Sequence, residues 1–164
     1  MDALELHYGR GKLIRHGLLS LGLSGLTLWA ALAGVREGED FQGNAAWIVD
    51  ILGPQGLMAL LWACVLLSAT FGILHLRRAF GDLVAARADG GGVTLNALLG
   101  THAYSAGDID RLEIVRAAGH PVISVTPVPG RGRRGGLAAN ALVESDGEVE
   151  AWVREVQARL GRRV

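Results

Sequence analysis

Residues 56–76 read GLMALLWACVLLSATFGILHL, and His75 is the one acidic or basic residue in this run. A second apolar run, residues 17–35 with the sequence GLLSLGLSGLTLWAALAGV, lies earlier in the chain. Runs of about 21 and 19 residues are roughly 28 to 31 Å long as α-helices, which is the thickness of the hydrocarbon core of a bilayer. We therefore expect two transmembrane helices, over about residues 13–35 and 56–78.

The charges that flank these runs predict their orientation. Basic residues lie before the first run and after the second: Arg10, Lys12, Arg15, Arg77, Arg78 and Arg87. The segment between the runs is acidic, with Glu37, Glu39, Asp40 and Asp50 against Arg36. Because basic residues collect on the cytoplasmic side of a membrane, we expect both termini inside and the connecting loop outside.

The first run has an alternative interpretation as a cleaved signal peptide. Its basic leader and the segment Ala31-Leu32-Ala33 resemble those of a signal sequence. However, the apolar stretch before that segment is longer than the usual signal core. We therefore favour a retained helix.

Small residues repeat at a four-residue spacing in both runs. They are Ser20 with Ser24, Ala59 with Ala63, and Ser68 with Gly72. Small side chains one helical turn apart let two backbones approach closely, so the spacing favours an antiparallel helix hairpin. The alternative is that small residues are common in membrane helices whatever their role.

The loop between the runs also contains an apolar stretch, Ala45–Leu52, which Pro54 closes. This stretch predicts either a short amphipathic segment in the outer interface or the first turns of a proline-interrupted second helix. At the other end of the first run, Met1–Gly11 alternates apolar and polar residues. It could lie at the membrane interface or add a strand to a sheet.

The residues from about 81 to 164 predict a small α+β domain. Leu83–Arg87 and Val93–Leu95 flank the turn Asp89-Gly90-Gly91-Gly92, which is a hairpin signal. Arg111–Arg116 and the β-branched Val122–Thr126 predict a second hairpin. Leu137–Val143 is a candidate for a last strand.

A final helix follows this candidate strand. Ser145 and Glu148 have the spacing of a capping box. Apolar residues then recur on one helical face: Val149, Trp152, Val153, Val156 and Leu160. A helix with a single apolar stripe needs a surface to cover, and the preceding strands supply one.

This order of elements resembles the small bacterial membrane proteins that carry a pleckstrin-homology-like domain, over about Lys12 to Leu160. Leu83–Arg87 corresponds to the first strand of that family's domain, which follows the second helix directly, and Gly90–Thr94 to the turn into the second strand. Asp108-Ile109 corresponds to the turn before the central hairpin, although Gly107 stands where the family often has an aromatic residue. The resemblance implies the bacterial inner (cytoplasmic) membrane and a seven-stranded sandwich or partly open barrel capped by the last helix. It implies no reaction, because a fold does not specify a function.

One loop carries the chain's densest basic sequence. Gly130-Arg131-Gly132-Arg133-Arg134-Gly135 has the spacing of a dinucleotide-binding loop, but no strand–loop–helix context surrounds it, which favours a solvated turn. Arg131, Arg133 and Arg134 are instead candidates for binding anionic lipid headgroups, at ~1 kcal/mol per charge near a membrane surface.

His16 and His75 form the one pair that could hold a metal group. They lie near the cytoplasmic ends of the two expected helices, where two imidazoles could ligate a haem. The ordinary alternative is a pair of interfacial histidines beside basic residues.

No constellation in the sequence points to catalysis. Cys64, the single cysteine, lies within the second apolar run, so its thiolate is disfavoured and no intrachain disulfide is possible. Asp108 and Asp110 are better explained as turn-forming residues. The formal net charge is +0, which gives no sign of a nucleic-acid partner.

We therefore expect a non-enzymatic accessory or scaffolding subunit of a larger integral membrane complex. It would need no cofactor and no small-molecule substrate, and it would contact membrane lipids. The alternatives are an anionic-lipid sensor that uses the three arginines and a haem-binding electron-transfer subunit that uses the two histidines.

Overall fold

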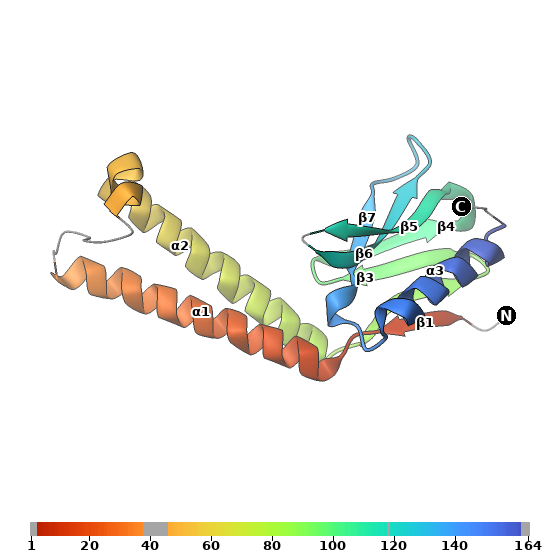
Figure 1. The fold of residues 1–164 in the computed structure, drawn as a ribbon, viewed down its shortest axis with the longest axis horizontal. Helices are drawn as coiled ribbons and strands as arrows, with labels where there is room; N and C mark the ends of the chain where they lie inside the picture. The colour runs from red at the N-terminus through yellow and green to blue at the C-terminus, as the bar shows by residue number, and fades with distance from the viewer. Residues whose placement is uncertain (1–2, 38–45, 118, 162–164) are drawn as a thin grey trace. The chain divides into compact units, whose positions relative to one another are not determined.

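The computed structural model describes residues 3–37, 46–117 and 119–161. It is an α+β protein that divides into two compact units (Figure 1). One unit, the β domain, comprises Met1–Leu13 and Arg78–Val164. The other, the helical pair, comprises Ile14–Arg77.

The β domain contains two antiparallel sheets. The first has the order β1 (Leu4–His7), β2 (Val84–Asp89), β3 (Gly92–Ala97) and β4 (Gly100–Ser105). The 3-10 helix η1 (Ala106–Asp108) leads to the second sheet, which has the order β5 (Ile109–Ala117), β6 (His120–Pro127) and β7 (Gly135–Ala138). After β7, the 3-10 helix η2 (Ala139–Ala141) precedes the last helix, α3 (Asp146–Arg159).

The helix α3 covers the core of the β domain, and it packs against β1 and β5. The predicted capping box is confirmed, because the Ser145 hydroxyl accepts a hydrogen bond from the Glu148 N–H and the Glu148 carboxylate accepts one from the Ser145 N–H. The Ser145 N–H and hydroxyl, which both donate to the Glu148 carboxylate, lower the pKa of Glu148. The predicted apolar face is buried at four positions: Val149, Trp152, Val153 and Val156.

Both predicted hairpins are confirmed, as β2–β3 and β5–β6. The predicted last strand is shorter than Leu137–Val143, because the chain turns into η2 after Ala138. The strand β4 was not predicted, since its sequence, GTHAYS, has no regular alternation and a single buried side chain.

The N-terminal segment supplies a strand, which settles the two interpretations of its alternating pattern. In β1, Leu4 and Leu6 pair with Ala88 and Ala86 of β2, and the Leu6 side chain is buried. A domain limit near residue 80 therefore omits this strand, because the β domain draws on both sides of the helical pair in sequence.

Two long helices contain the apolar runs: α1 (Arg10–Glu37) and α2 (Ala46–Ala79). Gly53 interrupts α2 with φ +68° and ψ 169°, immediately before Pro54. The stretch 46–52 is thus a short helix ahead of the long one, consistent with a proline-interrupted second helix. By length and composition, the segment Gln55–Ala79, of mean hydropathy 2.3, is the one helix among the described residues that could cross a membrane.

Within the helical pair, glycines and a serine bring α1 and α2 into close contact. A Cβ atom added at Gly72 would lie 2.7 Å from Cγ of Leu21 and 3.0 Å from the carbonyl oxygen of Gly17. About two turns further along both helices, the buried Ser24 hydroxyl donates a 3.1 Å hydrogen bond to the carbonyl of Val65. The contact therefore depends on small residues, which let two helix backbones approach closely.

Replacing Gly72 with leucine is expected to separate the two helices, because the new side chain would occupy the space of Leu21 and the Gly17 carbonyl. Cysteines introduced at Ser24 and Val65, in a Cys64→Ser background, should cross-link in membranes, and Gly72→Leu should slow this reaction at least about tenfold, the effect of ~1.4 kcal/mol. Ala63→Leu is the matched control, since Ala63 is exposed. Equal cross-linking rates in the two variants would contradict the observed contact.

Candidate functional site

The three arginines proposed for anion binding lie in the loop between β6 and β7, but they differ in their contacts. Nη1 of Arg131 lies 2.9 Å from Oδ1 of Asp108. Arg134 donates a 3.0 Å hydrogen bond to Ser124 and lies 3.8 Å from Glu113. The exposed Arg133 side chain has no ion pair or hydrogen bond with the described residues.

A polar cavity of about 290 Å³ lies between this arginine loop and strand β4. Its lining includes the loop residues Arg131, Gly132 and Arg133 and the β4 residues from Thr101 to Ser105. The Tyr104 hydroxyl fixes the loop against the strand by donating a 2.9 Å hydrogen bond to the carbonyl of Arg133. The cavity thus combines one unpaired guanidinium with hydroxyl and imidazole groups of β4.

Strand β7 and the 3-10 helix η2 separate the arginine loop in sequence from the segment that precedes α1. β7 runs back from the loop for roughly 13 Å at ~3.3 Å per residue, and η2 extends it further. Only after η2 does the chain reach Leu142, which pairs with Tyr8 just before α1 begins. The lipid-sensing role of the three arginines stays a prediction.

The glycine spacing of the same loop does not form a dinucleotide site. A pyrophosphate site needs a helix whose N-terminus follows the glycines. Here Gly135 begins strand β7 instead. Its Cα is packed against Tyr104, because an added Cβ atom would lie 2.2 Å from the Tyr104 hydroxyl.

A second cluster, which we call the root cluster, consists of Tyr8, Arg78 and Asn96. The Arg78 guanidinium lies over the Tyr8 ring, 5.2 Å from its centroid, and donates hydrogen bonds to the carbonyls of Val84 and Asn96. The Tyr8 hydroxyl donates a 2.8 Å bond to the same Asn96 carbonyl. The root cluster therefore ties the last turn of α2 to the segment before α1 and to β3.

The beginning of α1 is held in the β domain by further contacts. The Gly9 N–H donates a 2.8 Å hydrogen bond to the Ala141 carbonyl, and the Lys12 ammonium donates one to the Leu142 carbonyl. Leu13 and Ala79 are fully buried. Both chain segments that lead into the helical pair thus belong to the domain core.

The root cluster predicts an alkaline limit to the stability of the β domain. Burial raises the pKa of Tyr8 from 10.0 to about 12, against the opposing effect of Arg78. The folded domain therefore favours the neutral phenol. The contribution of neutral Tyr8 to the stability of the domain is complete below pH 10 and is lost as the pH rises through 12. The loss should reach roughly 3 kcal/mol, at about 1.4 kcal/mol per pKa unit.

Urea unfolding of the full chain in detergent, followed between pH 8 and 12, measures this loss. Tyr8→Phe removes the titrating hydroxyl, so its stability should depend less on pH than that of the wild type. An unchanged pH dependence in Tyr8→Phe would show that other groups cause the alkaline loss.

The two histidines proposed as haem ligands do come together in the helical pair. The rings of His16 and His75 lie 5.8 Å apart between centroids at an interplanar angle of 85°, which is the geometry of an edge-to-face aromatic contact. Nδ1 of His75 is 2.7 Å from the carbonyl oxygen of Phe71. Directly beside the pair, a Cβ atom on Gly17 would lie 2.9 Å from Leu76. The closely packed helices favour the histidine pair as a helix contact rather than a haem site, and the described residues contain no cluster of three or more metal-ligating side chains.

The six helix-packing candidates occupy different faces of the helical pair. Ser24 and Gly72 lie in the contact between α1 and α2, whereas Ser20 and Ser68 are half-buried. Ser68 donates its hydroxyl hydrogen within its own helix, to the carbonyl of Cys64. Ala59 and Ala63 are exposed. The α1–α2 contact therefore does not use these alanines.

The root cluster was not predicted from the sequence. Tyr8 continued the alternation of the N-terminal segment, and Arg78 was counted as one of several basic residues beside the membrane. Asn96 carried no signal, because its partners are far away in sequence. The pairing of β1 with β2 brings these residues together.

Comparison with protein-family models, with curated proteins and with solved structures finds no match to this chain. The interpretation of the site therefore depends on its own residues.

Proposed function

We propose that this chain is a non-enzymatic accessory subunit of a larger bacterial inner-membrane complex, with two transmembrane helices and a cytoplasmic interaction domain. The observation that carries the proposal is that the β domain is built around both chain segments that lead into the helical pair. Arg78 and Lys12 bond to the domain, and Leu13 and Ala79 lie in its core. Such a domain is joined to the membrane helices through two chain segments, which suits an adaptor held at the membrane surface.

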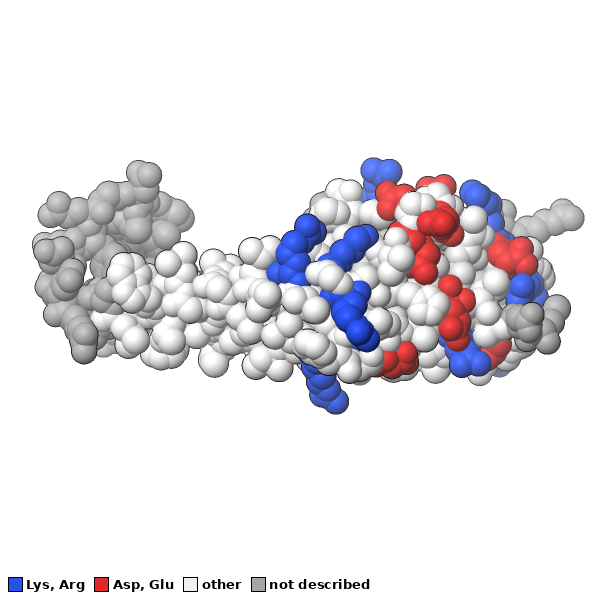
Figure 2. Space-filling model, turned by 90° about the horizontal axis from the view of Figure 1, so that it is seen from below, with Lys and Arg blue, Asp and Glu red and all other residues white. Residues whose placement is uncertain are grey.

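The surface of the helical pair supports a membrane location. Large apolar side chains are exposed along both helices, including Leu18, Leu23, Leu26, Trp29, Trp62, Leu66, Leu67 and Phe71. Figure 2 shows this surface free of charged side chains, with Lys and Arg side chains gathered where it ends. Basic residues beside apolar helices support a cytoplasmic position of both termini.

The order of the strands supports the resemblance to a pleckstrin-homology-like domain. Four antiparallel strands, three antiparallel strands and a closing helix follow one another, which agrees with the seven strands and capping helix that the resemblance implies. β1 departs from the resemblance, because it precedes the two helices. In this proposal the helical pair is an insertion between the first and second strands.

A partner helix would contact the face of α2 that is turned away from α1. Ala59 and Ala63 are exposed one turn apart on that face, where their small side chains allow a third helix to approach closely. This face is distinct from the one that contains Val65 and Gly72.

Affinity purification of the full chain from native membranes in mild detergent tests the proposal. We expect an assembly that contains another integral membrane protein in fixed stoichiometry. Ala63→Leu should remove most of this protein, whereas Cys64→Leu, on a neighbouring face, should retain it. A wild-type chain that purifies alone as a monomer would refute the accessory role.

A further inference from the structure

We propose that the outer edge of β4 binds an extended, acidic segment of a partner protein as an additional β-strand. This inference rests on the proposed accessory function and names the chemistry of the partner. Its elements are the backbone of β4, the cavity beside it and the side chain of Arg133.

The backbone of β4 has hydrogen-bonding groups free to pair with another strand. β4 is the last strand of its sheet, next to β3. Just beyond it, the Ala106 N–H donates to the Gly91 carbonyl, which sets the alternation of the antiparallel ladder. It follows that His102 and Tyr104 bond to β3, whereas the N–H and C=O groups of Thr101 and Ala103 and the N–H of Ser105 point outward. These outward groups have no backbone partner among the residues that the structure describes.

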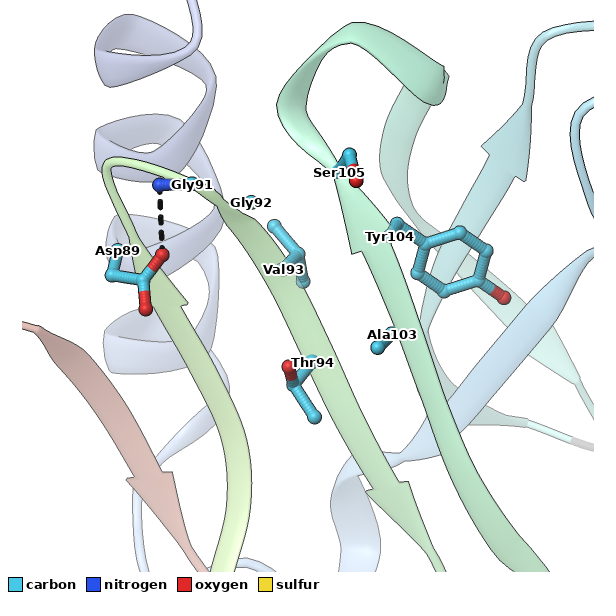
Figure 3. A pocket seen from close by; sticks show the side chains of 8 residues that line it. All are labelled: Asp89, Gly91, Gly92, Val93, Thr94, Ala103, Tyr104 and Ser105. Atoms are coloured by element: carbon cyan, nitrogen blue, oxygen red, sulfur yellow. Dashed lines mark hydrogen bonds between the residues drawn. The ribbon is translucent and has the colours of Figure 1, made fainter.

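The edge of β4 is accessible on both sides. The cavity of about 290 Å³ lies between β4 and the arginine loop, and a second cavity of about 190 Å³ lies over β3 and β4. Ala103, Tyr104 and Ser105 line both cavities. Figure 3 shows the second cavity, with the Tyr104 ring extending away from β3 and the Asp89 carboxylate accepting a hydrogen bond from the Gly91 N–H.

The sequence of β4 lacks the devices that protect other edge strands. Edge strands usually carry charges, prolines or bulges that prevent pairing with another chain. The edge strand β5 carries Arg111, Glu113 and Arg116, and β1 carries Glu5. β4 has no Lys, Arg, Asp, Glu or Pro, and its register with β3 is regular over six residues. The edge strand β7 also lacks charged residues and proline, but it has four residues against the six of β4, so β4 is the better site for an added strand.

The charge beside this edge indicates an acidic ligand. Arg131 and Arg134 are offset by Asp108 and Glu113, whereas Arg133 remains unpaired within the described structure. A carboxylate on the added strand would supply the missing partner of Arg133. The backbone of β4 would provide affinity, and Arg133 would provide specificity, as in other cases of β-strand addition.

Titration of the full chain in lipid nanodiscs with three synthetic peptides tests this proposal. The peptides alternate valine with glutamate, lysine or threonine. We expect the glutamate peptide to bind at least about tenfold more tightly than the lysine peptide, a difference of ~1.4 kcal/mol. Arg133→Glu should reverse this preference, whereas the matched control Arg116→Glu, at an exposed position of β5, should not.

A second variant tests the backbone contact. Ala103→Pro removes one outward N–H and no bond to β3, so it should abolish peptide binding while thermal unfolding stays close to that of the wild type. If Ala103→Pro fails to fold, Arg133→Glu still decides the outcome. Equal binding of the glutamate and lysine peptides, no binding of either, or self-association of the chain through β4 would each refute the proposal.

The same variants separate this inference from the accessory function. If peptides fail to bind and the Arg133→Glu chain still purifies with its membrane partner, the β4 proposal is wrong and the accessory role stands. If the wild-type chain purifies alone, the accessory role is wrong.

Discussion

Replacing Gly92 with alanine is expected to destabilise the β domain by about 4 kcal/mol, which is a large fraction of the stability of a small domain. Gly92 begins β3 with φ +154°, a conformation that residues with a Cβ atom rarely adopt. An added Cβ atom would lie 1.9 Å from the carbonyl oxygen of Tyr104, which belongs to the backbone of β4. The backbone cannot move away without breaking the β3–β4 ladder.

Hydrogen exchange of the full chain in detergent micelles measures this effect. The amides of β3 and β4 should lose protection by about a thousandfold, the equivalent of ~4 kcal/mol. Gly90→Ala is the matched control in the same turn, because nothing lies within 4 Å of its added Cβ atom. Similar protection in the Gly92→Ala and Gly90→Ala proteins would contradict the close approach.

Arg78→Ala is expected to destabilise the β domain by roughly 3 kcal/mol. The change removes two charge-assisted hydrogen bonds, of 3.1 Å to Val84 and 2.8 Å to Asn96, and the contact with the Tyr8 ring. Such bonds contribute about 1.5 kcal/mol or more each when they are partly buried, and the cation–π contact adds up to about 1 kcal/mol.

The neighbouring arginine provides the control for this prediction. Arg77 is exposed, so Arg77→Ala removes the same charge and should change the stability by less than about 0.5 kcal/mol. Urea unfolding in detergent, followed by the exchange of β2 and β3 amides, distinguishes the two variants. Equal losses would show that net charge at the end of α2, rather than the root cluster, stabilises the domain.

The elements that were predicted correctly are those with strong local patterns. The hairpin at Asp89–Gly92 has a glycine turn, the β5–β6 hairpin has β-branched residues, and α3 has a capping box with one apolar face. In each case neighbours in sequence determine the conformation. β4 lacks such a pattern because it gains its structure by pairing with β3.

The candidate sites show the same division. The sequence identified the arginine loop but could not show that Asp108 and Glu113 offset two of its three arginines. The sequence also predicted that His16 and His75 lie near the same end of the two helices. It did not predict the close glycine contact that packs the helices beside them. These properties depend on residues that are distant in sequence.

By itself the sequence determined the two long apolar helices and the local strands and helix of the β domain, because hydrophobic length, periodicity and turn residues act over a few positions. The tertiary structure decided that β1 completes the first sheet, that Arg78 and Tyr8 join the roots of both helices, and that β4 remains an open edge beside Arg133. These features arise from contacts between residues that are distant in sequence. The Tyr8–Asn96 bond has a separation of 88 residues, and the Tyr104–Arg133 bond has one of 29. A pattern over a few neighbouring residues does not indicate which distant residues will pair.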